Sequence, residues 1–571
     1  MFLPATKEEM LKLGWERPDI TLISGDAYID SPFIGTAVIG NWLSANGFKV
    51  AVIAQPDIHS DEIAALGEPK LFWGVSAGAM DSFVANYTAL NKFRNDDDLT
   101  PGAINNRRPD RACMVYSNLI RRYFKNTKPI VLGGVEASLR RIVHYDFQDN
   151  ALRRSILFDA KADAIIYGMG ERATLELACA LRDGNEWRGI KGLCYISKIK
   201  NESAIELPSF EECRQDPDYF SKAFKTFYDN ACMNSPQILC QKHNDRYLTQ
   251  NPKQPPLTPQ ELDAVYDLDY TREVHPSSQK YGKVKAQDTI KFSITSHRGC
   301  FGECNFCAIA VHQGKETVSR SRQSIINEVV KITKLKDFKG YISDIGGPTA
   351  NMYGSHCNAR RQPENHDAKT EENAVYAPAG SCINKRCLFP QMCKNLYAGH
   401  SEHLDLLKEA SKVEGVKKVF ISSGIRYDMI CQDGDGGENY LKFISANNVS
   451  GQMKIAPEHA DERILELMGK PSSSYLKRFI EMFNKNKNAN QFLTYYFIAA
   501  YPGCSQKETQ FLHSFIKKTL KTRPQQVQIF TPTPSTLATL MYYTGKDLNG
   551  NDIFVEKDRN AKQKQKRTLT D

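Results

Sequence analysis

Three cysteines between residues 300 and 307 have the spacing of a metal-binding loop. Cys300, Cys304 and Cys307 are separated by three and two residues in the segment RGCFGECNFC. Close thiolates in a loop can each hold one corner of a cubane cluster, and electron-carrying [4Fe–4S] clusters use four cysteines. Three thiolates leave one iron open, which indicates chemistry at that iron. S-adenosylmethionine (SAM) could bind there, and an electron from the cluster would break a C–S bond to give a 5′-deoxyadenosyl radical.

Zinc is the main alternative for this loop. It prefers four ligands, and the nearest extra donors are His297 and His312. Free thiols of a hydrophobic core would not normally be flanked by Gly299, Gly302 and polar residues. Phe306 lies between the last two cysteines, so we expect it to pack over the cluster or the adenine. Simple core packing of this ring is compatible with that expectation.

Four further cysteines lie in one inserted stretch, at about residues 350–399. Cys357, Cys382, Cys387 and Cys393 are separated by 24, four and five residues. Four thiolates suffice for a second closed [4Fe–4S] cluster or for a structural zinc. The stretch is polar and weakly periodic, so a metal would supply the stability that its side chains lack. Unligated thiols of a surface loop are the alternative to this second metal centre.

The elements that must position these cysteines form a strand–helix alternation from residue 289 on. Six strand patterns occupy residues 289–295, 340–346, 416–423, 452–456, 492–500 and 525–530. They predict a parallel (β/α)6 partial TIM barrel over residues 289–545, with its active site at the carboxyl ends of the strands. The inserted cysteines follow the second strand, so we expect them on the active face.

A separate strand–helix alternation occupies residues 1–183. Its strand patterns cover residues 21–25, 48–56, 71–78, 129–138 and 162–172. They predict a doubly wound α/β domain whose ligands bind at the carboxyl ends of the strands. Residues 184–288 are less regular and contain the Pro-rich NPKQPPLTPQ, which predicts an irregular linker or wrapping region.

The composition is that of a globular protein. Of the 571 residues, 41% are hydrophobic and 25% are charged, and no apolar run approaches a membrane span. The N-terminus shows no signal peptide, so we expect a cytoplasmic protein without membrane contact. The odd count of 15 cysteines argues against a disulfide framework. The net charge of +9 permits a nucleic-acid partner without requiring one. The basic tail, residues 546–571, is predicted to be disordered.

Several segments resemble the YgiQ-type proteins of the radical SAM superfamily. They are ITSHRGCFGECNFCAIAVHQG, SRSRQSI, SDIGGPTANMY, KIAPEH, TPTPSTLATLMYYTG and the opening MFLPATKEEMLKLGW. The resemblance implies a [4Fe–4S] cluster, SAM, radical initiation and an electron donor such as flavodoxin or ferredoxin. It implies no substrate, and both an RNA- or nucleotide-derived molecule and a small metabolite stay open. An iron–sulfur module that binds SAM without turnover is the alternative function.

The resemblance also places SAM-binding residues at the strand ends. Gly346 and Gly347 end the second strand, where such enzymes carry a turn that faces the methionine amino group, and a proline here replaces the usual acid. The other candidates follow the third strand or lie in the fourth: Ser422, Ser423, Arg426, Lys454 and Glu458. The resemblance implies that Arg426 pairs with the SAM carboxylate. Lys454 and Glu458 would meet the carboxylate or the ribose.

The segments GDAYIDSPFIG, VLGGVEAS and YGMGER resemble the cobalamin-binding domains that precede many radical SAM barrels. Those domains often ligate cobalt through an Asp-x-His-x-x-Gly loop. The first loop of this chain has Asp26 and Gly35 but no histidine, and only His59 and His144 precede residue 183. We therefore do not expect cobalamin as a cofactor.

Overall fold

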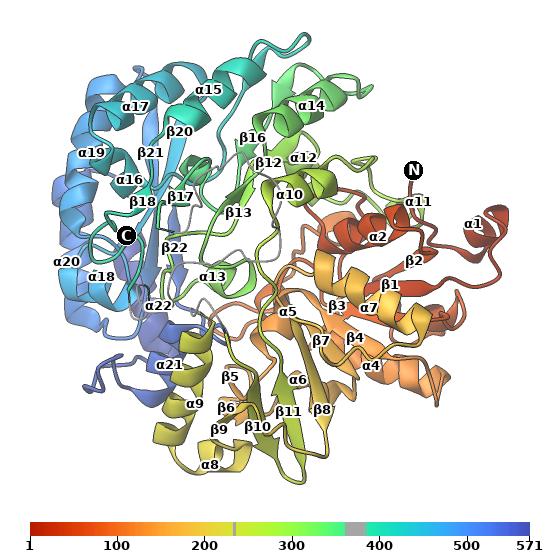
Figure 1. The fold of residues 1–571 in the computed structure, drawn as a ribbon. Coiled ribbons are helices and arrows are strands. Elements are labelled where there is room, and N and C mark those ends of the chain that lie inside the picture. The colour runs from red at the N-terminus through yellow and green to blue at the C-terminus, as the bar shows by residue number, and fades with distance from the viewer. Residues whose placement is uncertain (232–235, 360–381, 383–384) are drawn as a thin grey trace.

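The computed structural model describes residues 1–231, 236–359, 382 and 385–571 (Figure 1). Within that part of the chain, the N-terminal half forms a nine-stranded sheet of order β2-β1-β3-β4-β7-β8-β11-β10-β9. Its strands are β1 (Ile20–Ser24), β2 (Val50–Ala54), β3 (Phe72–Ser76), β4 (Ile130–Gly133), β7 (Ala164–Ile166), β8 (Leu193–Ser197), β9 (Ile205–Leu207), β10 (Leu239–His243) and β11 (Arg246–Gln250).

Five strands of this sheet run parallel and coincide with the five predicted strand patterns. β1 pairs with β2 and β3, and the ladder continues through β4 to β7. All five residues of β1 are buried, as expected for a strand that is covered by helices on both faces. The covering helices include α2 (Gly35–Ala45), α4 (Ala112–Tyr123), α5 (Gly134–Leu139) and α7 (Glu171–Asp183). The predicted α/β fold with a parallel sheet is confirmed.

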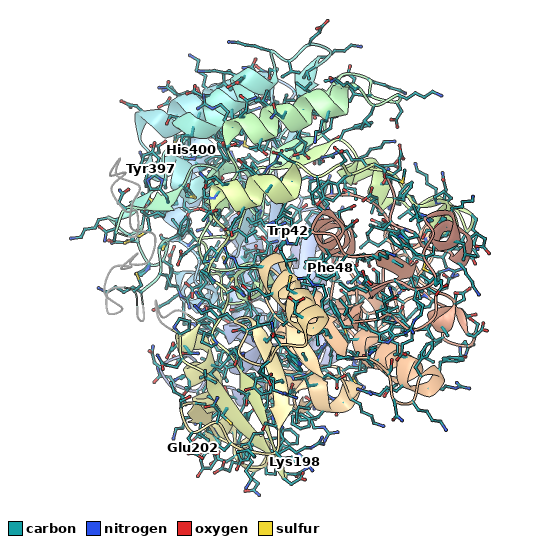
Figure 2. All side chains as sticks on the ribbon, turned by 45° about the vertical axis from the view of Figure 1, so that its right-hand side comes forward. Trp42, Phe48, Lys198, Glu202, Tyr397 and His400 are labelled. Atoms are coloured by element: carbon teal, nitrogen blue, oxygen red, sulfur yellow. The ribbon has the colours of Figure 1, made fainter. Side chains whose placement is uncertain are left out.

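The prediction that residues 184–288 are irregular is wrong over much of their length. β8 pairs antiparallel with β7, and β11, β10 and β9 extend the sheet further. Helices α8 (Phe210–Gln215) and α9 (Pro217–Asn230) pack on this extension. The strands LCQKH and RYLTQ mix polar and apolar residues without strict alternation, so periodicity could not reveal them. In Figure 2, Lys198 and Glu202 mark the outer end of this extension.

The C-terminal half contains parallel strands at each of the six predicted positions. They are β12 (Ser293–Thr295), β15 (Tyr341–Ile342) with β16 (Asp344–Gly346), β19 (Lys418–Val419), β20 (Gln452–Glu458), β21 (Phe492–Ala499) and β22 (Gln526–Ile529). β12 pairs with β16, β15 with β19, and β21 with both β20 and β22. A parallel bridge joins Ile425 to Ile455. In the described residues these ladders are separate, so the six-unit partial barrel stays a prediction.

Helices alternate with these strands, and short hairpins complete the fold. The helices of this half are α13 (Ala308–His312), α14 (Arg322–Thr333), α15 (Ser401–Ala410), α16 (Tyr427–Gln432), α17 (Asp435–Asn447), α18 (Glu462–Met468), α19 (Ser473–Asn486), α20 (Gln506–Phe515), α21 (Leu537–Thr544) and α22 (Arg559–Thr570). The remaining elements are α1 (Lys7–Lys12), α3 (Ser82–Asn86), α6 (Ile156–Ala160), α10 (Pro259–Tyr266), α11 (Pro276–Gln279), α12 (Ala286–Ile290), β5 (His144–Asp146), β6 (Ala151–Arg153), β13 (His297–Arg298), β14 (Val318–Ser319), β17 (His356–Cys357) and β18 (Leu396–Tyr397).

One large hydrophobic cluster spans the two halves. It contains Trp73 and Tyr145 from the first half and Tyr501, Phe530 and Tyr542 from the second. The rings of Tyr145 and Tyr542 have centroids 6.0 Å apart. Because both halves bury side chains against each other, the carboxyl ends of their strands are held at a fixed separation.

The predicted disorder of residues 546–571 is also wrong, because this segment contains helix α22. Lys562, Gln565 and Leu569 are buried on one face of α22, which packs on α20, β21 and β22. Two of these three residues are polar, so the buried face has no apolar periodicity that the sequence could show. The Gln565 side-chain oxygen accepts hydrogen bonds from the Ala500 amide and the Thr509 hydroxyl, each at 3.0 Å.

We expect Gln565→Ala to destabilise the protein by about 1–3 kcal/mol, because it leaves buried donors without a partner. Lys564→Ala is the matched control, since Lys564 is exposed on the same helix. Surface changes of that kind usually stay within about 0.5 kcal/mol. Chemical denaturation of both variants measures the difference, and equal stabilities would show that α22 is not docked as described.

Candidate active site

A cavity of about 460 Å³ lies between the two halves. One wall is formed by the carboxyl ends of β1, β3, β4 and β7, with Asp26, Gly78 and Gly134 among its residues. The other wall includes His297 and Gly347 and comes from residues 295–313, the end of β16 and the segment after β19. Parallel sheets bind ligands at the carboxyl ends of their strands, so the cavity lies where the sequence predicted ligand sites in both halves.

Two glycines let the strand ends of the first wall approach closely. Gly78 has φ +103° and a Cβ there would lie 2.1 Å from an Asp26 carboxylate oxygen, while a Cβ on Gly134 (φ +79°) would lie 2.6 Å from the Ser76 hydroxyl. The Asp26 carboxylate accepts hydrogen bonds from Arg108 at 2.5 Å and from the Ala79 amide at 2.6 Å. The Asp26 carboxylate therefore already has hydrogen-bond partners within the protein, although Asp26 lines the cavity.

The loop of Cys300, Cys304 and Cys307 runs between β13 and α13. The Cys300 amide donates to the Gly314 carbonyl at 3.3 Å, and the Cys307 amide donates to the Cys304 carbonyl at 3.0 Å. Gly299 precedes the loop with φ +80°, and a Cβ there would lie 1.7 Å from the Glu316 carbonyl oxygen. This position therefore requires glycine. Residues on both sides of the loop line the cavity: Thr295, His297 and Arg298 before it, and Ile309, His312 and Gln313 after it.

The three thiols of the loop lie close enough to affect one another. Burial, together with the neighbouring thiols of Cys304 and Cys300, raises the pKa of Cys307 to about 12. Burial also raises the pKa of Cys300, which Arg426 opposes. Arg426 donates from Nη1 to the Cys304 Sγ at 3.8 Å. The buried thiols therefore need a cation if they are to be thiolates. Among the described residues, no three His, Cys, Asp or Glu side chains are placed to hold a single metal ion.

Gly346 and Gly347 line the cavity at the end of β16, and their role in binding SAM stays a prediction. Their close neighbours explain the residue type. A Cβ on Gly346 would lie 2.7 Å from the Ser423 hydroxyl, and a Cβ on Gly347 would lie 2.7 Å from the His297 ring. Ser423 lines the same cavity. Backbone carbonyls at the end of β16 can therefore approach a ligand without interference from a side chain.

Asp344 organises this strand end, and sequence reasoning missed it. The amides of Ser422 and Ser423 donate to its Oδ1 at 2.8 and 3.2 Å, and the Ser423 hydroxyl donates to Oδ2. Burial raises the pKa of Asp344, whereas these bonds and Lys454 lower it. The only sequence signal was its place two residues before Gly346, on the same face of the strand. Asp344 thus joins the ends of the second and third strands.

Arg426 and Glu458 lie at the adjoining strand ends, and both are buried. Arg426 forms a two-pronged pair with Asp428, at 2.8 and 2.6 Å. Burial lowers the pKa of Arg426, but Asp428 and the nearby thiols outweigh it and raise the pKa. Glu458 ends β20 with φ +67°, and its carboxylate lies 3.8 Å from Lys470. Burial raises the pKa of Glu458, which Lys470 and Arg426 oppose.

Phe306 packs into the shared core. Its ring lies edge-on to Tyr501, with centroids 6.3 Å apart and an interplanar angle of 84°. This contact matches the core-packing alternative for Phe306. Its packing over a cluster or an adenine stays a prediction.

The four inserted cysteines also come together. The Cys393 amide donates to the Cys387 carbonyl at 2.8 Å, and Cys357 pairs with Leu396 across the β17–β18 ladder. Burial raises the pKa of Cys387 to about 12, with further contributions from the thiols of Cys357, Cys393 and Cys382. Cys387 and Cys393 share a small hydrophobic cluster with Cys300. The two cysteine sets are therefore neighbours. Within the predicted insertion, residues 360–381 and 383–384 lie outside the described residues.

Comparison with known proteins identifies the family of this chain. The family model described as radical SAM N-terminal matches residues 2–293. A UPF0313 protein of Fusobacterium nucleatum is 52% identical over 576 residues, covering 100% of this chain and 99% of the relative. A UPF0313 protein of Thermotoga maritima is 45% identical over 579 residues, covering 100% and 98%. The chain is therefore a radical SAM protein, which is an enzyme class. Within that class it belongs to the UPF0313 family, and this membership specifies no reaction.

Two solved structures share the fold. The radical SAM methyltransferase TsrM from Kitasatospora setae, with cobalamin and a [4Fe–4S] cluster bound, aligns with a TM-score of 0.51 at 12% identity. The alignment covers 91% of this chain and 77% of TsrM. The cobalamin-dependent SAM radical enzyme OxsB, with aqua-cobalamin bound, aligns with a TM-score of 0.50 at 11% identity. That alignment covers 94% of this chain but only 57% of OxsB.

These structures overturn our expectation about cobalamin. We did not expect this cofactor, because no histidine follows Asp26 in the first loop. Both solved structures of the same fold nevertheless belong to cobalamin-containing enzymes. The physical reason is that the cavity is lined by strand ends and apolar side chains of both halves, so the lack of one cobalt-ligating histidine does not remove it.

The structure also bears on membrane contact. Among the helices of the described residues, none has the length and apolar content to cross a bilayer.

Proposed function

We propose that this enzyme binds a [4Fe–4S] cluster through Cys300, Cys304 and Cys307 and cleaves SAM reductively to start radical chemistry. The observation that carries the proposal is the position of the three interacting thiols beside Arg426, in a loop whose flanking residues line the cavity between the halves. When bound, the cluster supplies the single electron that cleaves the C–S bond of SAM into methionine and a 5′-deoxyadenosyl radical. A protein of the flavodoxin or ferredoxin class would deliver that electron.

The chain's own residues hold the reactants in this proposal. Arg426 lies within 3.8 Å of the Cys304 sulfur and offsets thiolate charge. Asp428 already accepts hydrogen bonds from one edge of the Arg426 guanidinium. A pair between Arg426 and the SAM carboxylate would therefore use the remaining N–H groups. Gly346 and Gly347 present backbone to the methionine end of SAM. The predicted six-unit partial barrel is the scaffold that this arrangement assumes.

We also propose that the cavity between the halves accepts a corrinoid. Support comes from the shared fold with cobalamin-containing enzymes and from the glycine-rich strand ends at Gly78 and Gly134. The substrate would then lie between the corrinoid and the SAM site, shielded from water by both halves. Neither an RNA- or nucleotide-derived substrate nor a small metabolite is favoured by a residue of this site.

A second metal centre on Cys357, Cys382, Cys387 and Cys393 completes the proposal. Its support is the interaction of Cys387 with the other three thiols, and the hydrophobic cluster that Cys387 and Cys393 share with Cys300. A cluster there would lie beside the first one, in a position to exchange electrons with it or to bind substrate. Zinc would instead give a structural site.

Reductive cleavage of SAM tests the proposed function. We expect the anaerobically reconstituted protein to convert SAM to methionine and 5′-deoxyadenosine when dithionite is added. Liquid chromatography of the products, with and without hydroxocobalamin, measures this conversion. S-adenosylhomocysteine as the sole SAM-derived product would contradict radical initiation and indicate methyl transfer alone.

A further inference from the structure

A smaller cavity of about 150 Å³ adjoins the main one. The two cavities share the lining residues Gly168, Met169, Arg298, His312 and Gln313. The smaller cavity is strongly basic. Its charged lining residues include one acid, Glu316, and five cations: Arg141, Arg172, Lys253, Arg298 and Lys315. Such a set is suited to an anionic ligand.

Three of these cations already have a carboxylate partner. Arg172 pairs with Glu261 at 2.7 Å, Arg298 pairs with Glu171, and Lys315 pairs with Glu303 at 2.6 Å. Lys253 donates to the Ala231 carbonyl at 2.9 Å. Arg141 differs from the paired cations, because in the described part of the chain no carboxylate lies within 4 Å of its guanidinium.

Arg141 is only 3% exposed, so its charge lacks the solvent that normally stabilises it. Nε donates to the Gln250 side-chain oxygen at 2.9 Å, and Nη1 donates to the Ser138 carbonyl. The guanidinium lies 4.4 Å from the ring centroids of both Tyr167 and Phe227. Burial lowers the pKa of Arg141; Tyr167 and Cys194 oppose this in part, and no carboxylate of the described residues does. A buried cation without a counter-ion is unfavourable.

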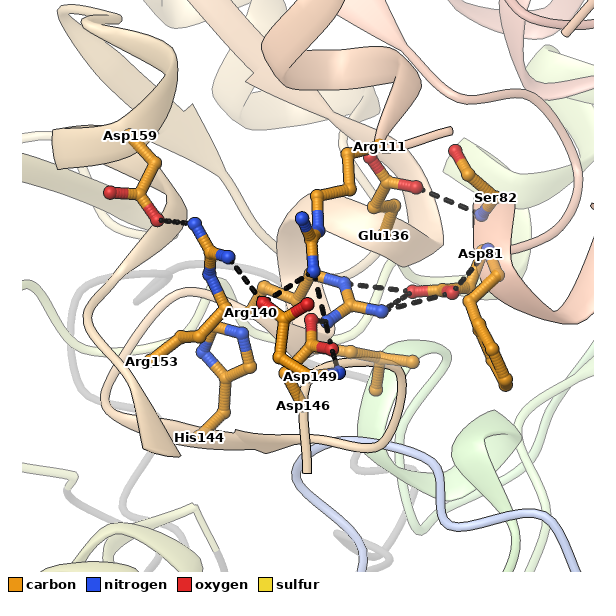
Figure 3. A network of polar contacts seen from close by, with 12 residues as sticks. Asp81, Ser82, Arg111, Glu136, Arg140, His144, Asp146, Asp149, Arg153 and Asp159 are labelled. Atoms are coloured by element: carbon orange, nitrogen blue, oxygen red, sulfur yellow. Dashed lines mark hydrogen bonds and ion pairs between the residues drawn. The ribbon is translucent and has the colours of Figure 1, made fainter. Parts of the chain in front are cut away.

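The preceding residue shows the opposite arrangement. Figure 3 shows Arg140 between Asp81 and Asp146, which lie 2.9 and 3.1 Å from its guanidinium. Arg140 is also buried. The carboxylates of Asp81 and Asp146 nevertheless raise its pKa. Within the described part of the chain, the fold therefore neutralises one buried arginine with two acids and places no acid beside its sequence neighbour, which lines a cavity.

We propose that the smaller cavity is an oxyanion site in which Arg141 pairs with a phosphate or carboxylate group of a ligand. The site goes beyond the proposed function, because it requires neither the cluster nor SAM. It is coupled to the main cavity through Ser138, whose carbonyl accepts from Arg141 and whose hydroxyl accepts from the Gly168 amide at 3.1 Å. The same hydroxyl lies 3.0 Å from the His312 Nδ1. A ligand can thus extend from the main cavity with its anionic end at Arg141.

Inorganic phosphate is the probe for the first test. We expect phosphate to raise the melting temperature of the full-length protein, and Arg141→Met and Arg141→Gln to weaken phosphate binding at least tenfold in calorimetric titration. We also expect Arg141→Met to melt at a higher temperature than the parent in anion-free buffer, because the variant removes a buried unpaired cation. Arg182→Met is the control, since Arg182 is exposed on α7 and pairs with Asp183; it should keep the parental phosphate response.

A structural role for Arg141 gives the opposite results. The proposal is overturned if phosphate binds the parent and Arg141→Gln equally, or if phosphate has no effect on the parent. It is also overturned if Arg141→Met melts earlier than the parent and retains the phosphate-induced shift. Arg141→Gln keeps polar atoms next to Ser138 and Gln250, so it serves as the test if the methionine variant does not fold.

Two corrinoids then distinguish the source of the anion. Hydroxocobalamin carries a nucleotide phosphate, whereas dicyanocobinamide lacks it. If Arg141→Gln weakens hydroxocobalamin binding but not cobinamide binding, the site holds the phosphate of the corrinoid. If Arg141→Gln changes neither but abolishes the phosphate response, the site holds an acidic group of the substrate. Visible absorption during titration measures both affinities.

Discussion

Cys304→Ala is expected to remove the iron of the first cluster and to reduce SAM cleavage at least a thousandfold. Two thiolates cannot hold a cubane that already has one open iron. Cys304 is also the sulfur that Arg426 contacts, at 3.8 Å, so its loss removes this contact and leaves Cys300 as the thiol that interacts with the guanidinium. Iron and sulfide analysis after anaerobic reconstitution measures the first effect, and 5′-deoxyadenosine formation measures the second.

Cys179→Ala provides the control for this variant. Cys179 is a partly exposed free cysteine on α7, remote in sequence from the loop and absent from the lining of the cavity. It should retain full iron content and full SAM cleavage. Equal iron content in Cys304→Ala and Cys179→Ala would contradict the assignment of the cluster to this loop.

Cys387→Ala is expected to remove the second metal centre while the first remains. The thiol of Cys387 interacts with those of Cys357, Cys382 and Cys393, so its loss breaks the donor set at its middle. We expect about eight irons, or about four irons and one zinc, in the parent protein. The variant should lose the metal bound by the inserted cysteines. Its thermal stability should fall as well, because the binding free energy of a structural zinc is on the order of 10 kcal/mol.

Metal analysis of the variants separates the two centres. Cys357→Ala should reproduce the loss seen in Cys387→Ala, whereas Cys304→Ala should retain the metal of the insertion. About four irons and no zinc in the parent, all lost in Cys304→Ala, would mean a single cluster and an unligated insertion.

Strong local patterns allowed much of the fold to be predicted. The five parallel strands of the N-terminal sheet were visible because each is an apolar run next to small residues, as in ITLIS of β1. The strands β8 to β11 and the helix α22 were not visible, because their buried faces include polar residues such as Gln241 and Gln565. Such residues are buried when a distant partner satisfies them, and no sequence window contains that partner.

The residues of the candidate site also differ in whether a local sequence pattern reveals them. The spacing of Cys300, Cys304 and Cys307 predicts a cluster because the three cysteines lie close together in the sequence. Asp344 gains its importance from Ser423, which lies far along the chain. Arg141 gains its importance because none of the described acidic side chains pairs with it, which only the folded structure can show. Cobalamin was not expected because the first loop lacks one histidine, although the cavity is a property of strand ends that packing brings together.

Electron paramagnetic resonance of the reduced protein, recorded with and without SAM, tests the open iron most directly. Our account predicts a [4Fe–4S]⁺ signal whose g-values shift when SAM is added, because SAM binds the iron that no cysteine occupies. The shift should persist in Cys387→Ala, and the signal that shifts should be absent from Cys304→Ala. A signal that SAM leaves unchanged in the parent protein would contradict a three-cysteine cluster that binds and cleaves SAM.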